Sequence, residues 1–217
     1  MFDLIASAFQ TRAESVVVAT TGSMDLAATA TGYTRATGSF LTDGFADGME
    51  ITPSGFTTNA AVIAQRVEAL TITVVGGLTV EATAPARTLQ ALMPTGRAYD
   101  NLNFTPTANR PWVNQSLVTG PSVLRSGPAS GGTREDTGLF IVHWYALANT
   151  GAAALRKSVQ AVAALFTSGT ALAAGSHTVH VRGDVAPSYS APRAVNGGWV
   201  LSTLSVPYRV YSTNTLQ

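Results

Sequence analysis

The clearest pattern of apolar and polar positions lies between Gly138 and Phe166, where strand-like alternation passes through a short turn into helical spacing. Residues 139–147 carry apolar and aromatic side chains in both alternating rows, which is typical of a strand covered on both faces. From Ala152 onward, apolar residues recur at the spacing of one helical face. The sequence therefore predicts a central strand followed by an amphipathic helix that packs on the same sheet.

The two ends of the chain show simpler patterns. Apolar residues recur at helical spacing within residues 1–18, which predicts a first helix. The same residues lack the charged leader and long apolar core of a signal peptide, and no apolar run reaches the length of a membrane span, so we expect a protein that is not exported. Near the other end, residues 177–181 and 199–211 predict strands, and Pro207 within the second indicates a bulge or an edge strand.

Turn signals containing glycine follow one another every few residues from Thr20 onward, between short apolar pieces. Residues 61–69 predict a strand or a short helical turn, and residues 70–82 predict a β-hairpin that turns at a pair of glycines. Residues 84–100, rich in alanine and arginine, are expected to be a connector.

The change in turn density divides the chain. We interpret residues 20–83 as a small all-β domain of barrel-like form, inserted into a core domain made of residues 1–19 and 84–217. Within this insertion, Phe40, Phe45 and Phe56 are expected to fill a small core. The alternative is that they form a carbohydrate- or receptor-binding face.

A long, glycine-rich segment separates the strand predicted at residues 111–118 from the central strand. We predict a mobile loop from Pro121 to Asp136, either a solvated linker or a functional segment. Its charged residues are the candidate assembly contacts: Arg125, Arg134, Glu135 and Asp136.

Composition narrows the possible functions. Charged residues make up 12% of the chain and the net charge is +1, so no bulk nucleic-acid-binding surface is expected. An isolated monomer usually needs more surface charge to stay soluble, which favours a surface covered by partners. The absence of cysteine excludes disulfides, zinc–thiolate sites and thiol catalysis, and fits a reducing cytoplasm.

No residues supply a nucleophile, a base and an orienting acid in a recognisable context, so an enzyme is not expected. His143 lies in the apolar central strand and is expected to be a hydrogen-bonded core or interface histidine. His177 and His180 would point to opposite faces of a strand, so chelation of a metal by both is not expected. We therefore predict no catalytic, metal or cofactor site.

Five segments, in this order, resemble the tail terminator proteins of bacteriophages with long, non-contractile tails: residues 101–106, 111–113, 138–142, 150–166 and 198–209. The positions that carry the resemblance, which we expect to be mainly structural, are Asn101, Phe104, Pro106, Trp112, Gly138, Trp199, Pro207 and Tyr208. The inserted domain departs from the minimal terminator pattern and resembles a small β-domain that recurs in phage tail proteins.

The resemblance implies an α+β fold in which helices pack on a mostly antiparallel sheet. It also implies a structural virion protein, assembled in the host bacterial cytoplasm, that forms a homohexameric ring in the neck at the head-proximal end of the tail tube. Such a ring ends tube polymerisation and provides the docking surface for head–tail joining. The implied partners are further copies of the chain, the tail tube protein, the head–tail connector or stopper protein and the tape measure protein, while genomic DNA passes through the lumen without specific binding and no membrane is involved.

The physical requirements of a ring agree with this reading. A ring closes when one patch of a subunit meets a different patch of the next, and low net charge reduces repulsion between the copies. The predicted loop is a candidate for ordering against the tube. The alternatives kept open are a head-completion, neck or minor tail protein, and a carbohydrate- or receptor-binding module that acts through the inserted domain.

Overall fold

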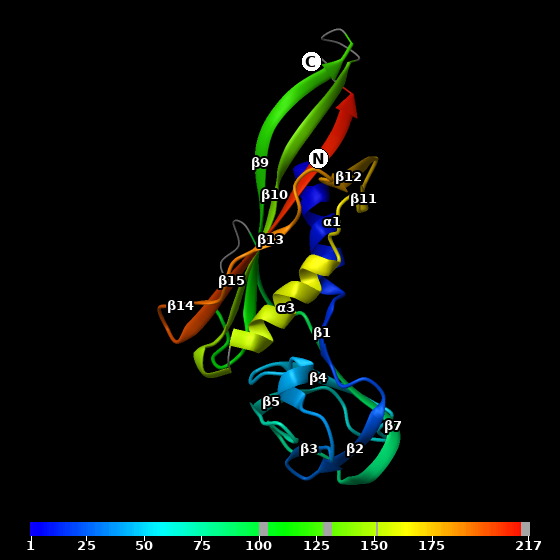
Figure 1. Cartoon of the computed structure of the whole chain (residues 1–217), viewed down its shortest axis with the longest axis vertical. Helices are drawn as coiled ribbons and strands as arrows, with labels where there is room; N and C mark the ends of the chain where they lie inside the picture. The colour runs from blue at the N-terminus through cyan, green and yellow to red at the C-terminus, as the bar shows by residue number, and fades with distance from the viewer. Residues whose placement is uncertain (100–103, 128–131, 151, 214–217) are drawn as a thin grey trace.

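The computed structural model describes residues 1–99, 104–127, 132–150 and 152–213. It is mostly β, with 51% of residues in strands and 16% in helices. In Figure 1 the molecule is elongated, with a small barrel-like sheet at one end, a larger sheet covered by two helices in the middle, and a long hairpin at the other end. The expected helices on a mostly antiparallel sheet describe only the larger part.

The smaller sheet has the strand order β1-β7-β2-β3-β6-β5-β4, and a further pairing of β4 with β7 closes it into a barrel. Closure satisfies backbone groups that an open edge would leave free. A single turn of helix, α2 (Phe40–Asp43), lies beside it. Its strands are β1 (Val17–Thr20), β2 (Met24–Thr29), β3 (Gly32–Thr34), β4 (Glu50–Ser54), β5 (Val62–Val67), β6 (Thr71–Val74) and β7 (Glu81–Leu92).

The larger sheet has the order β11-β12-β15-β10-β9-β8, with β13 and β14 also paired to β15. The β8–β9 pair is parallel and the other described pairs are antiparallel. Its strands are β8 (Gly96–Tyr99), β9 (Trp112–Ser126), β10 (Thr133–Leu147), β11 (Ala171–Ala174), β12 (His177–Val181), β13 (Ser188–Tyr189), β14 (Arg193–Val195) and β15 (Trp199–Thr213). The helices are α1 (Phe2–Glu14), the 3-10 turn η1 (Ala148–Thr150) and α3 (Ala152–Ala164).

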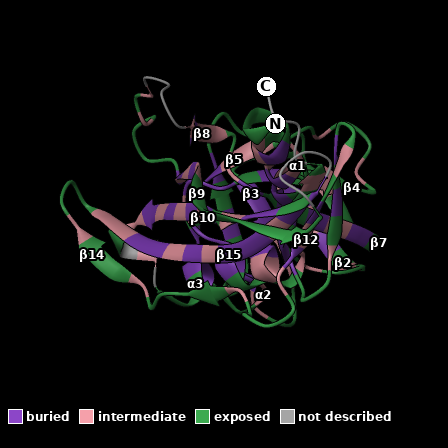
Figure 2. Cartoon of the chain, turned by 90° about the horizontal axis from the view of Figure 1, so that it is seen from above, coloured by how far each residue is buried: buried purple, intermediate pink, exposed green. Residues whose placement is uncertain are grey.

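The core of the larger part centres on Phe9 of α1. Its ring stacks on Phe140 of the central strand at 4.9 Å between centroids, and Phe166 and Tyr208 both lie at 5.5 Å. Alternation of buried and half-buried residues along β10 and β15 puts one face of the sheet against the helices (Figure 2). The predicted first helix, central strand and following helix are confirmed.

The barrel has its own aromatic core. Phe40 and Phe45 are fully buried and meet edge to face at 5.9 Å. Phe56 is half-buried, next to Tyr33 and beneath the Arg87 guanidinium, which lies 4.2 Å from the ring centre. The prediction that these aromatics fill a core is confirmed for Phe40 and Phe45, so they form no exposed binding face.

Two predictions for residues 70–100 were wrong. The predicted hairpin at residues 70–82 does not form, because β6 pairs with β3 and β5 while β7 pairs with β1, β2 and β4. The predicted connector at residues 84–100 holds most of β7 and all of β8. The arginines of this segment suggested an exposed connector, but Arg87 is buried. Its guanidinium donates to the carbonyls of Leu26 and Ala82 and pairs with Glu81 at 2.9 Å.

The barrel extends beyond the predicted insertion on both sides, since β1 begins at Val17 and β7 ends at Leu92. The chain enters and leaves it side by side, where the Met93 N–H donates to the Val16 carbonyl at 3.3 Å. Adjacent ends are what an insertion requires. The division into a core of residues 1–19 and 84–217 and an insertion of 20–83 stays a proposal, and the sheet itself favours boundaries near 16 and 93.

Pro207 lies in neither a bulge nor an edge strand, contrary to expectation. The β10–β15 register runs without a shift, and Pro207 pairs with Leu139. Its carbonyl accepts the Arg182 N–H at 2.9 Å on the side away from β10. Because the N and O atoms of a strand residue point the same way, the missing N–H would also face away from β10, so the proline costs that ladder no hydrogen bond.

Candidate assembly surfaces

The long segment predicted as a mobile loop is instead the outer part of a hairpin. β9 continues to Ser126 and β10 begins at Thr133, and these two residues pair. The hairpin stands out from the body of the molecule in Figure 1. Glycines and a proline hid the strand pattern, because the register of β9 skips at Gly120 and Pro121, where a bulge accommodates both.

The four candidate contact residues form two ion pairs on this hairpin. Glu135 accepts from Arg125 Nε at 2.9 Å and Nη2 at 3.2 Å, and these bonds hold the pKa of the Glu135 carboxyl below its usual value. The other pair joins Arg134 Nε to Asp136 Oδ1 at 2.8 Å, and the Ser122 hydroxyl also bonds to this carboxylate. The structure thus brings all four residues together in pairs.

The two pairs are asymmetric in exposure. The Arg125 and Arg134 side chains are 57% and 44% exposed, whereas the Glu135 and Asp136 side chains are only 9% and 5% exposed. Neighbouring strand residues point to opposite faces, so one pair lies on each face of the hairpin. A partner that approaches the hairpin tip, defined here as residues 122–126 and 133–136, therefore meets guanidinium groups on both sides.

Apolar side chains are also exposed along this hairpin and the adjoining end of β15. They are 37% to 49% exposed: Val118, Val123, Leu124, Leu139 and Tyr211. From Val118 to Ser126, β9 pairs only with β10 among the described strands. An exposed strand edge flanked by apolar side chains is a surface that proteins usually cover.

Three of the positions that carry the resemblance meet in one aromatic cluster on the face of the sheet away from α1 and α3. Trp112 stacks on Tyr145 at 3.8 Å and contacts Phe104 at 5.4 Å and Trp199 at 6.3 Å. All four rings are half-buried. The sequence pattern did not single out Tyr145, which lies opposite Trp112 only because β9 and β10 pair in this register.

The remaining resemblance positions are structural in their surroundings. Gly138 lies so close to Tyr208 that a Cβ atom at Gly138 would come within 2.5 Å of the Tyr208 hydroxyl oxygen. Burial and the charge of Asp136 raise the pKa of Tyr208 to about 12. Pro106 is half-buried between β8 and β9. Asn101 lies outside the described residues.

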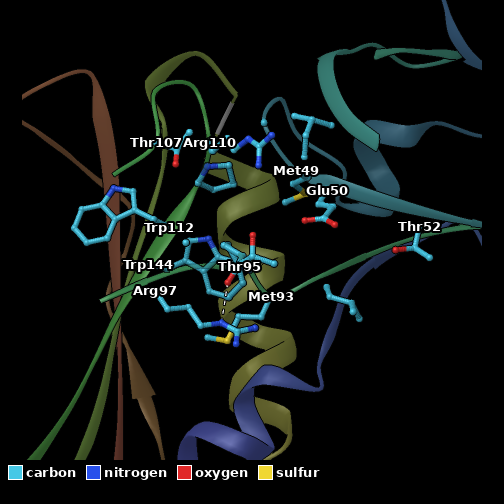
Figure 3. Close-up of a pocket in the computed structure, with 16 residues that line it drawn as sticks. Met49, Glu50, Thr52, Met93, Thr95, Arg97, Thr107, Arg110, Trp112 and Trp144 are labelled. Carbon is cyan, nitrogen blue, oxygen red and sulfur yellow. Dashed lines mark hydrogen bonds between the residues drawn. The ribbon is translucent and has the colours of Figure 1, made fainter. Parts of the chain in front are cut away.

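A cleft separates the barrel from the larger sheet (Figure 3). It holds a cavity of about 130 Å³, with Met49, Glu50 and Thr52 on the barrel side. Arg97, Arg110 and Trp144 lie on the side of the larger sheet. Arg97 pairs with Glu14 at 2.9 Å, and neither Glu50 nor Arg110 has an ion-pair partner among the described residues.

Charge is divided unequally between the two parts. Residues 17–92 contain six carboxylates and three arginines, a net charge of −3, which leaves +4 for the rest of a chain whose total is +1. All three arginines of the barrel pair with carboxylates of the barrel. The acids without an arginine partner there are Asp25, Asp47 and Glu50. Glu50 lines the cleft, and Asp47 lines a neighbouring pocket that shares Gly48, Ile63 and Arg110 with it. Sequence reasoning missed this division, although the charges can be counted from the sequence once the barrel's limits are known.

Within the described ranges, no three or more His, Asp or Glu side chains lie close enough together to hold a metal ion. His143 is half-buried and its Nδ1 lies 2.9 Å from the Thr203 hydroxyl, as expected for a hydrogen-bonded strand histidine. Burial lowers the pKa of His143, and the charge of Arg193 adds to this effect. In the part of the chain that the structure covers, no helix is long and apolar enough to cross a bilayer.

Comparison with known proteins gives one informative match. The sequence profile of the phage tail terminator proteins matches residues 79–208, which is more than half of the chain. No curated protein matches. One solved structure, whose title states no function, is similar at a TM-score of 0.44 and 21% identity over 54% of this chain and 79% of the other, which is too weak to carry an argument.

The profile match begins near the start of β7 and includes β8, the hairpin, the central strand, α3 and most of β15. It therefore covers the elements that hold the aromatic cluster, the Gly138–Tyr208 contact and both ion pairs of the hairpin tip. The chain belongs to the phage tail terminator family, and is a structural protein of the bacteriophage tail.

Proposed function

We propose that this protein forms a homohexameric ring at the head-proximal end of the tail tube, ends the polymerisation of the tube and offers the ring's other face to the head connector. The proposal makes it a structural rather than a catalytic protein. Its place would be the neck of the virion, after assembly in the bacterial cytoplasm.

The single observation that carries the proposal is the projecting hairpin of a tail terminator family member. Two 15-residue strands extend beyond the helix-covered core with Val123 and Leu124 exposed on opposite faces. β15 pairs with β10 as far as Thr133, so the unsupported side of the hairpin is the edge strand β9. An edge strand with exposed apolar side chains gains stability when a neighbour covers it. Contacts of this kind, repeated from each subunit to the next, are what a closed ring requires.

The other proposed partners follow from the family and the position. The tail tube protein would contact one face of the ring, the head–tail connector or stopper the other, and the tape measure protein and genomic DNA would pass through the lumen. Low net charge agrees with passage of DNA, because a strongly basic lining would retain the phosphates.

The test is the state of the purified protein alone and with tail tubes. Light scattering and negative-stain microscopy are expected to show six-fold rings, or one ring at one end of each tube, and tubes assembled with the protein should stop growing. A stable monomer that never binds tubes contradicts the proposal. Location in another part of the particle would favour a head-completion or minor tail protein instead.

A matched pair of variants tests the role of the hairpin. Val123 on the hairpin and Val185 in the loop after β12 are both 45% exposed. Val123→Asp places a charge on the proposed contact and is expected to prevent ring formation while the melting temperature changes little. Val185→Asp adds the same charge elsewhere and is expected to leave rings intact. Equal behaviour of the two variants would remove the hairpin from the interface.

A further inference from the structure

The molecule carries a cationic protrusion and an acidic recess far apart along its long axis (Figure 1). The protrusion is the hairpin tip with the exposed Arg125 and Arg134. The recess is the barrel wall of the cleft and of the pocket beside it, which we call the acidic wall and define by Glu50 in the cleft and Asp47 in the neighbouring pocket. Because the two lie at opposite ends of the larger sheet, they cannot meet within one subunit.

We propose that the hairpin tip of one subunit docks on the acidic wall of a second copy of this chain. This inference rests on the proposed ring and names the two patches that would close it. Tip and wall are different surfaces, so the contact is head to tail, the type of contact that forms a ring when its rotation closes.

Charge is the first argument for this pairing. The carboxylates at the tip are covered by their own arginines, so the tip presents positive groups outward. Glu50 is exposed and has no ion-pair partner among the described residues, and Asp47 accepts only the Val67 N–H at 2.7 Å. Complementary charge accelerates association and sets the register of an interface.

Charges on the other wall of the cleft do not cancel the acidic wall. Arg97 is held by Glu14 and by the Pro94 carbonyl. Arg110 lines the cleft and lies farther than 4 Å from the carboxylates described there. The acidic wall therefore remains available to a cation from outside.

The size and the apolar lining of the cavity in the cleft limit which part of the hairpin tip can enter it. A cavity of about 130 Å³ admits a side chain but not a hairpin, so the strands stay outside while one guanidinium group enters. Ile63 and the exposed Leu92 line the cavity beside Glu50 and offer apolar surface to the stem of an arginine and to Leu124, whereas Met49 and Trp144, which also line it, are buried.

A charge swap tests the pairing without breaking the hairpin. The double change Arg125→Glu with Glu135→Arg keeps an ion pair within the tip but presents a carboxylate, and Glu50→Arg reverses the acidic wall. Each is expected to weaken ring formation by roughly tenfold or more, as expected for like charges facing each other. Combining all three changes in one chain should restore rings, whereas Asp25→Arg, a matched reversal of an exposed barrel acid outside the cleft, should leave them unchanged.

Disulfide trapping gives a second readout that does not depend on charge. The chain has no native cysteine, so every disulfide formed must join two introduced cysteines. Leu124→Cys on the tip and Thr52→Cys in the cleft should crosslink neighbouring subunits into a covalent ladder on a non-reducing gel. Leu124→Cys with Asp25→Cys should give none.

The two proposals fail separately. Unchanged rings in both charge-reversed variants, with no crosslinking through Thr52→Cys, would overturn this pairing and leave the ring standing. A wild-type protein that forms no ring at any concentration, with or without tubes, would remove the proposed function itself.

Discussion

Trp112 and Tyr145 stack face to face across β9 and β10, with ring centroids 3.8 Å apart and ring planes within 1° of parallel. They are directly opposed residues of the antiparallel ladder. Cross-strand aromatic pairs fix the register of two strands, and this one lies at the base of the projecting hairpin. The stack therefore anchors the strands that carry the proposed contact.

We expect a double-mutant cycle on Trp112→Ala and Tyr145→Ala to give a coupling energy of about 0.5–1.5 kcal/mol, the range for aromatic pairs. The measurement is urea unfolding at one protein concentration, because self-association would shift the apparent stability. Trp112→Ala alone should lower the free energy of unfolding by about 2–4 kcal/mol, since this half-buried ring contacts three others. Strictly additive effects would mean that the stack contributes nothing beyond burial.

Gly138 is expected to tolerate no side chain. A Cβ atom there would lie 2.4 Å from the Val118 carbonyl oxygen and 2.5 Å from the Tyr208 hydroxyl oxygen. Gly138→Ala should therefore lower the free energy of unfolding by about 1–3 kcal/mol through overpacking. Gly96→Ala is the matched control, because its nearest contacts would be at an ordinary 3.4 Å. Thermal melts of the two variants make the comparison, and equal stabilities would contradict it.

Stability should fall between neutral and mildly acidic pH because of His143. Its pKa in the folded protein is below the ordinary value of 6.5, so the unfolded chain takes up the proton first as the pH falls. The stabilisation is present above about pH 6.5 and is lost as the pH falls toward the folded pKa. His143→Gln keeps a hydrogen-bonding group beside Thr203 and should flatten this part of the profile, measured by urea unfolding from pH 7.5 to 5.5. An unchanged slope would mean that another group causes it.

Removal of the barrel tests the domain proposal. Replacing residues 17–92 by a short linker should leave a folded larger domain, because Val16 and Met93 are hydrogen-bonded neighbours. Replacing only residues 20–83 should be less favourable, since it leaves parts of β1 and β7 without their sheet. Circular dichroism and the cooperativity of thermal unfolding distinguish the two shortened chains. Loss of cooperative unfolding in the first would show that barrel and sheet form one core.

The sequence by itself determined the elements with strong local periodicity. The first helix, the central strand and the helix after it could be read from apolar spacing, since a face that must be buried imposes its period on the chain. Burial of Phe40 and Phe45 followed in the same way from the small size of the barrel. The order of the resemblance positions was enough to indicate the family.

Only the tertiary structure decided which strands pair and which charged groups meet. β7 was hidden because Arg87 is buried against Glu81 and two carbonyls, and no local pattern reveals a buried arginine. The outer part of the hairpin was interpreted as a loop because Gly120 and Pro121 interrupt the strand pattern, and the bulge that accommodates them exists only opposite β10. Strand pairing and charge division depend on contacts between residues distant in sequence, and these are fixed when the whole chain packs.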